Sequence, residues 1–458
     1  MIIKNFSGGQ SSDDQVGIKG AYKIGRNLDT RKKTDSLSCG NALSLVTGLT
    51  NERVNVFVDT PNGAIYAFCQ SGKIYVGNST GSNWSLSCTD TDGIIYGASI
   101  YDSGTSTDLY YIIGDSTSKK LKKATIVVSL VPSLITSWTQ NMPTTINPML
   151  QVMDRLMFST GNNLGMVEQD GSSQLAVELF PINTTISAMG KTKDYLILGF
   201  YAPNQTETYI KVVACGDDVA VEKTIPVLTS NIEAIIKSPE DLLVFAGGIL
   251  YSCDLTDVYA LKELNGNSNN YAVCSRNKIA HIGISKTGAT LENEGVFSYG
   301  RVSLEKSKTL NNDFYYNAQE TISMTSTISN NLVVCYNDGG IYKTFYENIA
   351  LKALSIYETL DIYPIDALTP ENTIKNLKVV MKKMSVGCKV RIGLIPDKEV
   401  DIDNVKWLKD MSGIEYIITT NAKVCYFPIN AQYDILNLVA ELTPSGVTTP
   451  EIYALIIS

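Results

Sequence analysis

The sequence repeats a strand–turn–strand pattern along most of its length. The stretch AIYAFCQSGKIYVG, which starts at Ala64, places two apolar runs around a Gly-containing turn and is typical of a β-hairpin. The pattern recurs in six further stretches. Shorter apolar runs precede most of the seven stretches, and more polar runs follow several of them. Each unit therefore holds about four short strands in roughly 45 residues, the spacing of a β-propeller blade. Related stretches start at Asp108, Arg155, Asp194, Asp241, Lys278 and Asn331.

This spacing predicts an all-β chain with a β-propeller of about seven blades over residues 18–355. Six or eight blades are alternatives, because the unit after Lys278 is long and residues 18–48 can complete a blade. A parallel α/β fold is disfavoured because residues 50–350 show almost no helical periodicity. A β-helix would need shorter, more regular rungs. A large sandwich stays open.

Two further segments flank the predicted propeller. Residues 356–458 contain short alternating strands separated by Pro, Gly and Asp, which favours a small β-sandwich domain. Residues 1–17, with the polar stretch SGGQSSDD, are interpreted as an extended N-terminal arm. The predicted domains are therefore 1–17, 18–355 and 356–458.

The charge balance argues against general nucleic-acid binding. The formal net charge is −8 and the sequence pI is about 5.0, whereas such proteins usually carry net positive charge. The one basic cluster, Lys119–Lys123 without Leu121, is interpreted as a solvated strand end or a guard of a sheet edge. No window approaches 18 uninterrupted apolar residues, and the N-terminus lacks a secretory apolar region. We therefore expect no membrane insertion and no direct reading of nucleic-acid sequence.

The cysteines do not form a metal-binding or disulfide pattern. They are odd in number, scattered and never spaced as CxxC, so we expect free thiols and synthesis in a reducing compartment. They are Cys39, Cys69, Cys88, Cys215, Cys253, Cys274, Cys335, Cys388 and Cys425.

Residues capable of catalysis are few. His281 is the only histidine and alternates with apolar neighbours, which favours a half-buried strand position over a catalytic triad. A glycosidase would need a carboxylate pair. The candidates Asp154, Asp194 and Asp241 recur at the same point of successive units, which indicates turn residues instead.

Two Gly-containing patterns are also interpreted as turns. Asp90–Gly93 begins like a calcium loop, but Tyr101 stands where the twelfth-position glutamate belongs. Gly247-Gly248 and Gly339-Gly340 fit hairpins that need positive φ, not phosphate-binding loops. The sequence thus predicts no catalytic, cofactor-binding or metal-binding residues, no cofactor, and a protein that is not an enzyme.

Several short patterns are similar to tailed-bacteriophage virion proteins that contain β-propellers. The opening Phe6-Ser7-Gly8-Gly9 precedes an Asn27-Leu28-Asp29 element, and Gly295–Arg301 reads GVFSYGR. Tyr357-Glu358-Thr359 leads into a strand pair around Gly387, and Thr448–Ile452 leads into the last strand. No tail-fibre repeat, collagen-like tract or lysozyme-type motif follows.

The resemblance implies a structural virion component, associated with the tail or neck, that acts as a rigid scaffold for protein–protein interactions. Its implied partners are other virion proteins of the tail, neck or portal-proximal region and copies of itself in a ring. It would be assembled in the host cytoplasm and reside in the virion. A carbohydrate-binding or depolymerising phage adhesin is the alternative, since 25 tyrosines suit sugar contacts as well as strands. A cellular WD40 hub fits less well, because the Gly-His and Trp-Asp signature is absent.

Overall fold

The chain is all-β in the part that the structure describes. The computed structural model describes residues 1–11, 19–31, 35–127, 129–139, 145–216, 218–286, 294–317, 319–363, 373–398, 402, 404–410, 412–419 and 423–458. Over these ranges the ordered elements are strands, with no helix and hence no helix able to cross a membrane. The predicted all-β class is confirmed.

The chain packs into two compact units. Unit 1 comprises residues 1–43, 296–315 and 347–458, and unit 2 comprises residues 44–295 and 316–346. Both units are therefore assembled from separated stretches of sequence, unlike the continuous segments 1–17, 18–355 and 356–458 expected from the sequence. The reason lies in strand pairing, which joins the N-terminal residues to C-terminal strands within unit 1.

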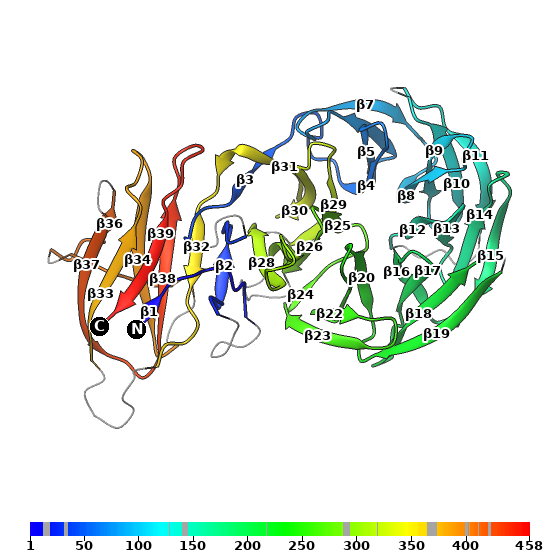
Figure 1. Ribbon diagram of the computed structural model, residues 1–458. Coiled ribbons are helices and arrows are strands. Elements are labelled where there is room, and N and C mark those ends of the chain that lie inside the picture. Colours follow the sequence, from blue (N-terminus) through cyan, green and yellow to red (C-terminus); the bar gives the residue numbers. More distant parts are fainter. Residues whose placement is uncertain are drawn as a thin grey trace. The chain divides into compact units, whose positions relative to one another are not determined.

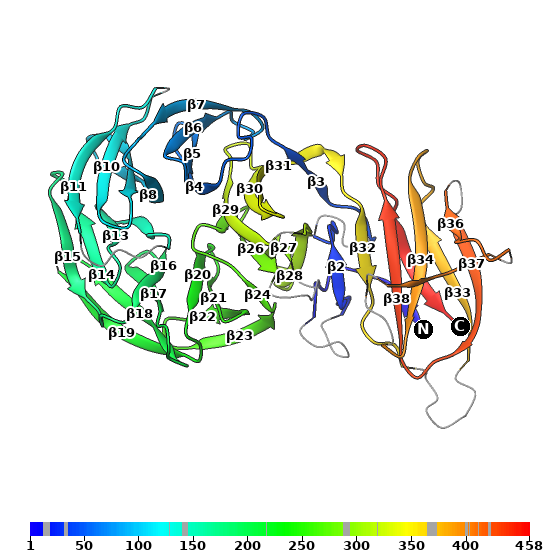
Figure 2. The ribbon, with the colours of Figure 1, turned by 180° about the vertical axis from the view of Figure 1, so that it is seen from behind.

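Unit 2 contains a series of four-stranded antiparallel meanders (Figures 1 and 2). Five of them, in the described residues, use consecutive strands: β4–β7, β8–β11, β12–β15, β16–β19 and β20–β23. A further sheet has the order β29-β30-β31-β3, so its fourth strand comes from far earlier in the chain. This use of an early strand to complete a late sheet is how a propeller removes an open edge. The β-propeller architecture predicted from the repeat is confirmed.

The strands of these meanders, with the short strands β24 to β26, have the following bounds: β3 (Asn41–Leu45), β4 (Val54–Asp59), β5 (Ile65–Cys69), β6 (Lys73–Gly77), β7 (Trp84–Thr89), β8 (Ile94–Asp102), β9 (Thr107–Gly114), β10 (Lys119–Thr125), β11 (Ser133–Trp138), β12 (Met149–Val152), β13 (Arg155–Ser159), β14 (Asn163–Val167), β15 (Ser173–Leu179), β16 (Thr185–Lys191), β17 (Tyr195–Tyr201), β18 (Thr208–Cys215), β19 (Val219–Val227), β20 (Ile232–Lys237), β21 (Leu242–Ala246), β22 (Ile249–Cys253), β23 (Val258–Glu263), β24 (Gly266–Asn267), β25 (Val273–Arg276), β26 (Ile279–Lys286), β29 (Glu320–Ser326), β30 (Leu332–Asp338) and β31 (Ile341–Lys352).

Neighbouring meanders pack face to face, which explains the hydrophobicity of their second strands. Every residue of β5 and of β21 is buried, because both faces of these strands meet apolar side chains. One buried cluster joins the first meander to the second through Phe68 and Tyr111, and another joins the first to the last through Ile65 and Val333. The outer strands β15 and β19 are instead partly exposed along their length. The ring of sheets is thus held by a series of shared cores.

Five of the first strands, β4, β8, β16, β20 and β29, carry a β-bulge near their start. The extra residue can send its side chain toward the next sheet: Asn55 Nδ2 donates to Ile95 O at 2.7 Å, and Ser187 Oγ donates to Ile232 O at 2.6 Å. A bulge re-aims one side chain and increases the local twist. The five bulge residues are Asn55, Tyr96, Ser187, Glu233 and Ile322.

Unit 1 contains two sheets around one buried cluster. One sheet has the order β1-β39-β33-β37, and within this unit the other runs β27-β28-β2-β32-β38-β34-β35, with β36 also paired to β34. In β34 the side chains of Val390, Ile392 and Leu394 belong to this cluster, and Ile395 is buried in a second, smaller cluster with Val405 and Val439. The bounds are β1 (Ile2–Ile3), β2 (Ile24–Arg26), β27 (Gly295–Gly300), β28 (Thr309–Phe314), β32 (Ser355–Glu358), β33 (Thr373–Met381), β34 (Lys389–Pro396), β35 (Lys406–Trp407), β36 (Ile417–Ile418), β37 (Val424–Gln432), β38 (Leu436–Thr443) and β39 (Ile452–Ile457).

The first residues of the chain belong to this unit. Ile2 and Ile3 pair with β39, and the side chain of Phe6 is completely buried. Residues 12–18, which include most of the SSDD stretch, lie outside the described residues. The first eleven residues therefore belong to a packed unit and do not form an extended arm. Of the predicted arm 1–17, only residues 12–17 lie outside the described residues.

Candidate functional site

One loop of unit 2 bonds to the first strands of several sheets. This loop, Ser268–Ala272, follows β24 and is called the hub loop here. Asn269 Nδ2 donates to the backbone oxygens of Thr321 and Ile322, both at 2.9 Å. These two oxygens belong to β29, the first strand of the sheet completed by β3. The hub loop is therefore fixed to one side of the ring of sheets.

The same loop also reaches sheets far from it in sequence. Asn270 Oδ1 accepts a hydrogen bond from Met189 N in β16 at 2.9 Å. Tyr271 Oη donates to Asn147 O, just before β12, at 2.9 Å. A single short segment can bond to all these first strands only where they converge. The hub loop thus occupies the centre of the propeller with its own side chains.

Glu233, the bulge residue of β20, holds the start of the hub loop. Its Oε2 accepts a hydrogen bond from Ser268 N at 2.6 Å. The carboxyl is buried, and this burial raises its pKa to about 7, although the hydrogen bond from Ser268 opposes the shift. The contact is a structural anchor whose carboxyl holds its proton to a higher pH than an exposed glutamate does.

Glu233 is expected to make the stability of unit 2 depend on pH. Its folded pKa of about 7 lies above the unfolded value, so its contribution is complete below about pH 4.5 and is lost as the pH rises through about 7. The variant Glu233→Gln keeps an acceptor oxygen and removes the titration. We expect the difference in unfolding free energy between variant and wild type to change by up to about 3 kcal/mol between pH 4.5 and pH 8. Urea unfolding across this range measures it, and a constant difference would contradict the assignment.

The basic run Lys119–Lys123 is not the solvated strand end expected from the sequence. Lys119 is completely buried in β10, and its Nζ donates to Asn147 Oδ1 at 2.6 Å and lies 3.8 Å from the centre of the Tyr96 ring. Burial lowers the pKa of Lys119 to about 7. The expectation was wrong because β10 is an inner strand, between β9 and β11, and not an edge.

Two further lysines of this run, Lys120 and Lys122, are paired with the acidic turn Asp90–Gly93. Lys122 Nζ lies 2.7 Å from Asp90 Oδ2 and 2.6 Å from Asp92 Oδ2, and Lys120 Nζ lies 2.9 Å from Asp92 Oδ2. Hydrogen bonds from both lysines hold the pKa of Asp92 below its ordinary value. A lysine ammonium thus stands where a calcium ion would have to bind, so the pattern is a turn with an internal ion pair. Among the described residues no group of three or more His, Cys, Asp or Glu side chains is placed to hold a metal.

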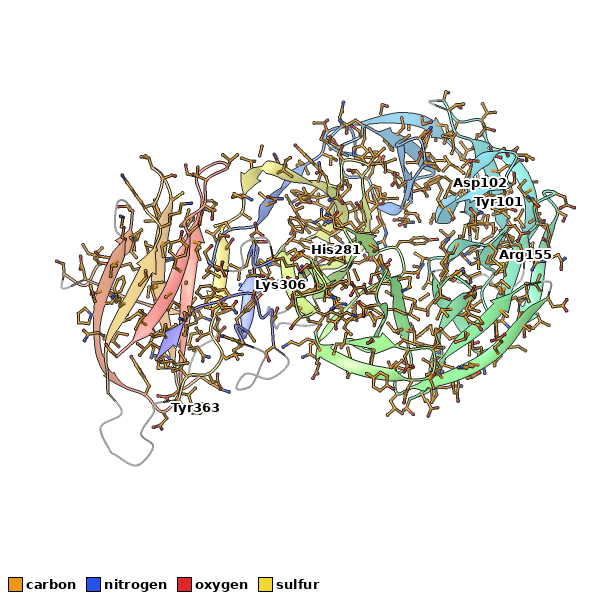
Figure 3. The ribbon with its side chains drawn as sticks, viewed as in Figure 1. Tyr101, Asp102, Arg155, His281, Lys306 and Tyr363 are labelled. Carbon is orange, nitrogen blue, oxygen red and sulfur yellow. The ribbon has the colours of Figure 1, made fainter. Side chains whose placement is uncertain are left out.

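The three candidate carboxylates occupy equivalent turns of successive sheets. Asp154, Asp194 and Asp241 lie in the hairpins between the first and second strands of the sheets β12–β15, β16–β19 and β20–β23. Asp154 contributes its backbone oxygen to a hydrogen bond from Tyr101 (labelled in Figure 3), at 2.5 Å. The structure therefore distributes these residues over three sheets and does not gather them in one site, in line with the turn interpretation.

The single histidine and the cysteines have structural surroundings. His281 (labelled in Figure 3) lies in β26, is 2% exposed, and receives a hydrogen bond from Arg276 Nε at 3.3 Å. It is therefore more deeply buried than expected. All nine cysteines are free thiols, seven of them buried, which confirms the absence of disulfides predicted from their spacing. The Gly pairs 247-248 and 339-340 have positive φ, as predicted for their hairpins.

The residues that carry the resemblance have packing roles in unit 1. The Phe6 ring meets the Tyr357 ring edge-on, with centroids 5.4 Å apart, and Tyr22 packs on the same ring at 5.6 Å. A Cβ atom on Gly8 would lie 2.1 Å from Ala21 N, so only glycine fits there. The opening pattern and the aromatic-Glu-Thr pattern thus meet in one buried cluster.

The Asn27 and GVFSYGR elements also meet in unit 1. Asn27 has a φ of 58°, its Oδ1 accepts from Tyr315 N at 2.7 Å, and its Nδ2 donates to Leu354 O at 2.9 Å. Ser298 in β27 bonds to the guanidinium of Arg31 through both its side chain and its backbone oxygen. These contacts link three sequence regions and assign the shared patterns to folding.

The hub loop and its anchor Glu233 could not be recognised from the sequence. The stretch NGNSNNY has the composition of an ordinary polar loop, and no local signal distinguishes it. The bulges in five of the first strands likewise leave no mark in the hydrophobic pattern. The signal that the sequence does carry is a polar residue near the start of several of these strands, as at Asn55, Ser187 and Glu233.

Comparison with known proteins yields structural similarity only. No protein-family model matches the chain, and no curated protein sequence matches it. Among solved structures, the WD40 β-propeller domain of Doa1 matches at 12% identity and TM-score 0.46, over 67% of this chain and 96% of that chain. The computationally designed Ika8 protein matches at 12% identity and TM-score 0.42, over 67% and 100%. A chain of the mitotic checkpoint complex matches at 8% identity and TM-score 0.48, over 67% and 90%. Similarity of this degree carries no argument about function.

Proposed function

We propose that this chain is a structural component of a tailed-bacteriophage virion, in the tail or neck, that serves as a rigid protein–protein interaction scaffold and not as an enzyme. The observation that carries the proposal is the hub loop. It fills the centre of the propeller with bonds to the first strands, so the blades are tied together where many propeller enzymes would need an open site. A rigid propeller of this kind can bind other proteins through the loops on its outer faces.

The proposal includes the finer architecture. Seven blades are supported by the five consecutive meanders and the sheet completed by β3, with the strands β24 to β26 of unit 2 as part of a further blade. A C-terminal β-sandwich is supported by the two sheets of unit 1 and their shared core of Leu377, Val379, Ile392, Leu438 and others. The partners would be other virion proteins and copies of the chain in a ring, and the chain would reside in the virion after assembly in the host cytoplasm.

The resemblance is the reason for choosing a phage particle among possible assemblies. The residues of its patterns are ones that the folding of unit 1 needs. Gly8 lies at a close backbone approach, Asn27 has a positive φ, and Phe6 lies in the core. Proteins with a common ancestral fold would retain such residues. No other described feature of the chain points to a particular assembly.

Loss of the gene is the direct test. In the genome that encodes the chain, a nonsense mutation is expected to give particles that lack a complete tail or neck by electron microscopy, and the wild-type chain supplied in trans is expected to restore them. Mass spectrometry of purified particles should detect the protein, and native mass spectrometry should detect a ring. Complete particles that fail only to adsorb to cells would instead favour the adhesin alternative. Complete and infectious particles without the protein would contradict both proposals.

A further inference from the structure

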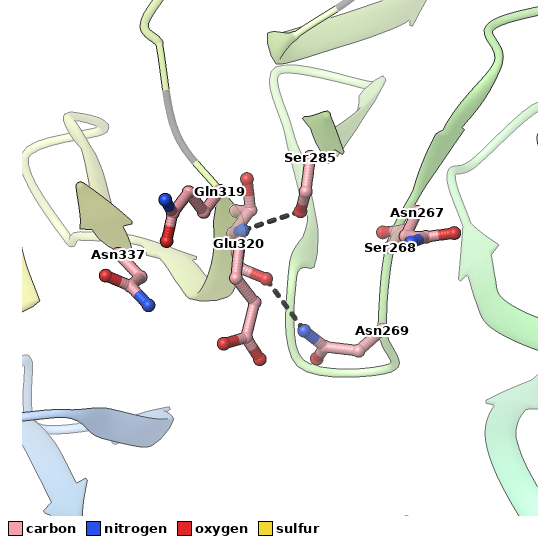
Figure 4. A pocket seen from close by; sticks show the side chains of 8 residues that line it. Asn267, Ser268, Asn269, Ser285, Gln319, Glu320 and Asn337 are labelled. Carbon is pink, nitrogen blue, oxygen red and sulfur yellow. Dashed lines mark hydrogen bonds between the residues drawn. The ribbon is translucent and has the colours of Figure 1, made fainter. Parts of the chain in front are cut away.

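A polar pocket lies between two sheets of unit 2, beside the hub loop (Figure 4). It has a volume of about 410 Å³ and is lined by residues of β24, β26, β29, β30 and the hub loop. This volume lies within the range of small-molecule sites, roughly 300 to 1,000 Å³, but the lining here is polar and not mainly hydrophobic. A ligand for this pocket must therefore be recognised by hydrogen bonds.

Three side-chain amides with unused hydrogen-bonding atoms line this pocket, Asn267 on one side and Gln319 and Asn337 on the other (Figure 4). Asn267 ends β24, Gln319 directly precedes β29, and Asn337 lies in β30. The Asn267 and Gln319 amides form no hydrogen bond with the described part of the chain, and both residues are exposed. Asn337 Oδ1 accepts from Gly340 N at 2.8 Å, which leaves its Nδ2 available to a ligand. The amides come from separate elements, so the fold and not one local loop brings them together.

The remaining walls of the pocket are already satisfied. Glu320 receives two hydrogen bonds from Arg53, at 2.8 and 3.0 Å, which neutralises its charge. Ser285 Oγ accepts from Thr321 N at 2.6 Å. A charged ligand would have to compete with the Arg53–Glu320 pair, whereas a neutral ligand would not.

We propose that this pocket binds one neutral sugar unit of a saccharide. A carboxamide offers both donors and an acceptor, and a sugar hydroxyl also both donates and accepts, so the three amides match a group of hydroxyls. The hub loop, held by Glu233, and the Arg53–Glu320 pair form fixed walls beside these amides. This site is additional to the scaffold function and does not depend on it, because a sugar pocket would serve the chain in any assembly.

Saturation-transfer NMR on the full-length chain tests the proposal. The probes are methyl α-D-glucoside, methyl α-D-galactoside and N-acetylglucosamine, with N-methylacetamide as a probe for peptide groups. We expect transfer to at least one sugar, with affinity reduced about fivefold in Gln319→Ala and in Asn337→Ala, since each loses one hydrogen bond. The control is Gln174→Ala, on the exposed side of the outer strand β15, which should leave binding unchanged.

The possible outcomes separate clearly. Transfer to a sugar that both pocket variants weaken supports the site, provided that the variants unfold thermally like the wild type. No transfer to any sugar overturns the proposal, and so does transfer that the pocket variants leave unchanged. Transfer to N-methylacetamide alone would replace the sugar by a peptide ligand. Because none of these results concerns particle assembly, failure here leaves the scaffold proposal standing, and the reverse also holds.

Discussion

Replacement of Phe6 by alanine is expected to destabilise unit 1 by about 3–5 kcal/mol, the usual cost of removing a buried phenylalanine. Phe6 is completely buried and packs against Tyr357, in the cluster that joins the N-terminal residues to the C-terminal sheets. Its loss would leave a cavity beside a ring that also contacts Tyr22. Urea unfolding should show the lower free energy of unfolding. Hydrogen exchange measured by mass spectrometry should show faster exchange of the amides in β2 and β32.

The matched control for Phe6 is a neighbouring apolar residue that is not buried. Ile2 is 59% exposed and pairs with β39 through its backbone, which an alanine retains. Ile2→Ala is therefore expected to change stability by no more than about 0.5 kcal/mol. Equal effects of the two substitutions would contradict the assignment of the opening pattern to the core of unit 1. Unchanged exchange in Phe6→Ala would contradict it as well.

Replacement of Lys119 by methionine is expected to remove a rise in the stability of unit 2 between about pH 7 and pH 10. The folded pKa of about 7 lies below the unfolded value of about 10.4, so between these values the unfolded chain binds one more proton than the folded chain. The free energy of unfolding therefore increases with pH in the wild type, by at most about 5 kcal/mol from this residue. Methionine cannot titrate, and the rise should disappear.

Urea unfolding of both proteins at several pH values measures this effect. Only the difference between variant and wild type is informative, because tyrosines and cysteines also titrate in this range. Lys120→Met provides the control from the same strand, since the Lys120 side chain is 34% exposed and forms an ion pair with Asp92. A difference that does not vary with pH would show that Lys119 does not titrate in the buried state. Loss of the hydrogen bond to Asn147 lowers the free energy of unfolding of the variant at every pH. The informative quantity is therefore the change with pH in the free-energy difference between variant and wild type, and not its absolute value.

Local pattern was sufficient for the strands and turns of this protein. The β-hairpin at Ala64 became β5 and β6, and the Gly247-Gly248 turn has the positive φ that its sequence requires. These features depend on residues adjacent in the chain, namely alternating or continuous hydrophobicity between turn residues. The free cysteines followed in the same way from their spacing.

The candidate site was much less predictable. Lys119 and Lys120 are neighbours of the same type in one strand, yet Lys119 is completely buried and Lys120 is partly exposed in an ion pair. A strand pattern says that they face opposite sides, but not what each side contacts. Asn270 and Met189 are 81 residues apart, and nothing near either residue announces their hydrogen bond. The three pocket amides are unremarkable in sequence for the same reason.

The sequence by itself determined the class of this protein: a chain of short strands in a regular period, with turns set by glycine and aspartate, which can bury its apolar residues only by stacking sheet on sheet. The tertiary structure alone decided which strands complete each other's sheets, which lysine is buried, and that a polar loop fills the centre of the propeller. The physical reason is that local hydrophobic pattern and backbone preference act between near neighbours. Burial and hydrogen bonding are instead satisfied between residues that only the folded chain brings together.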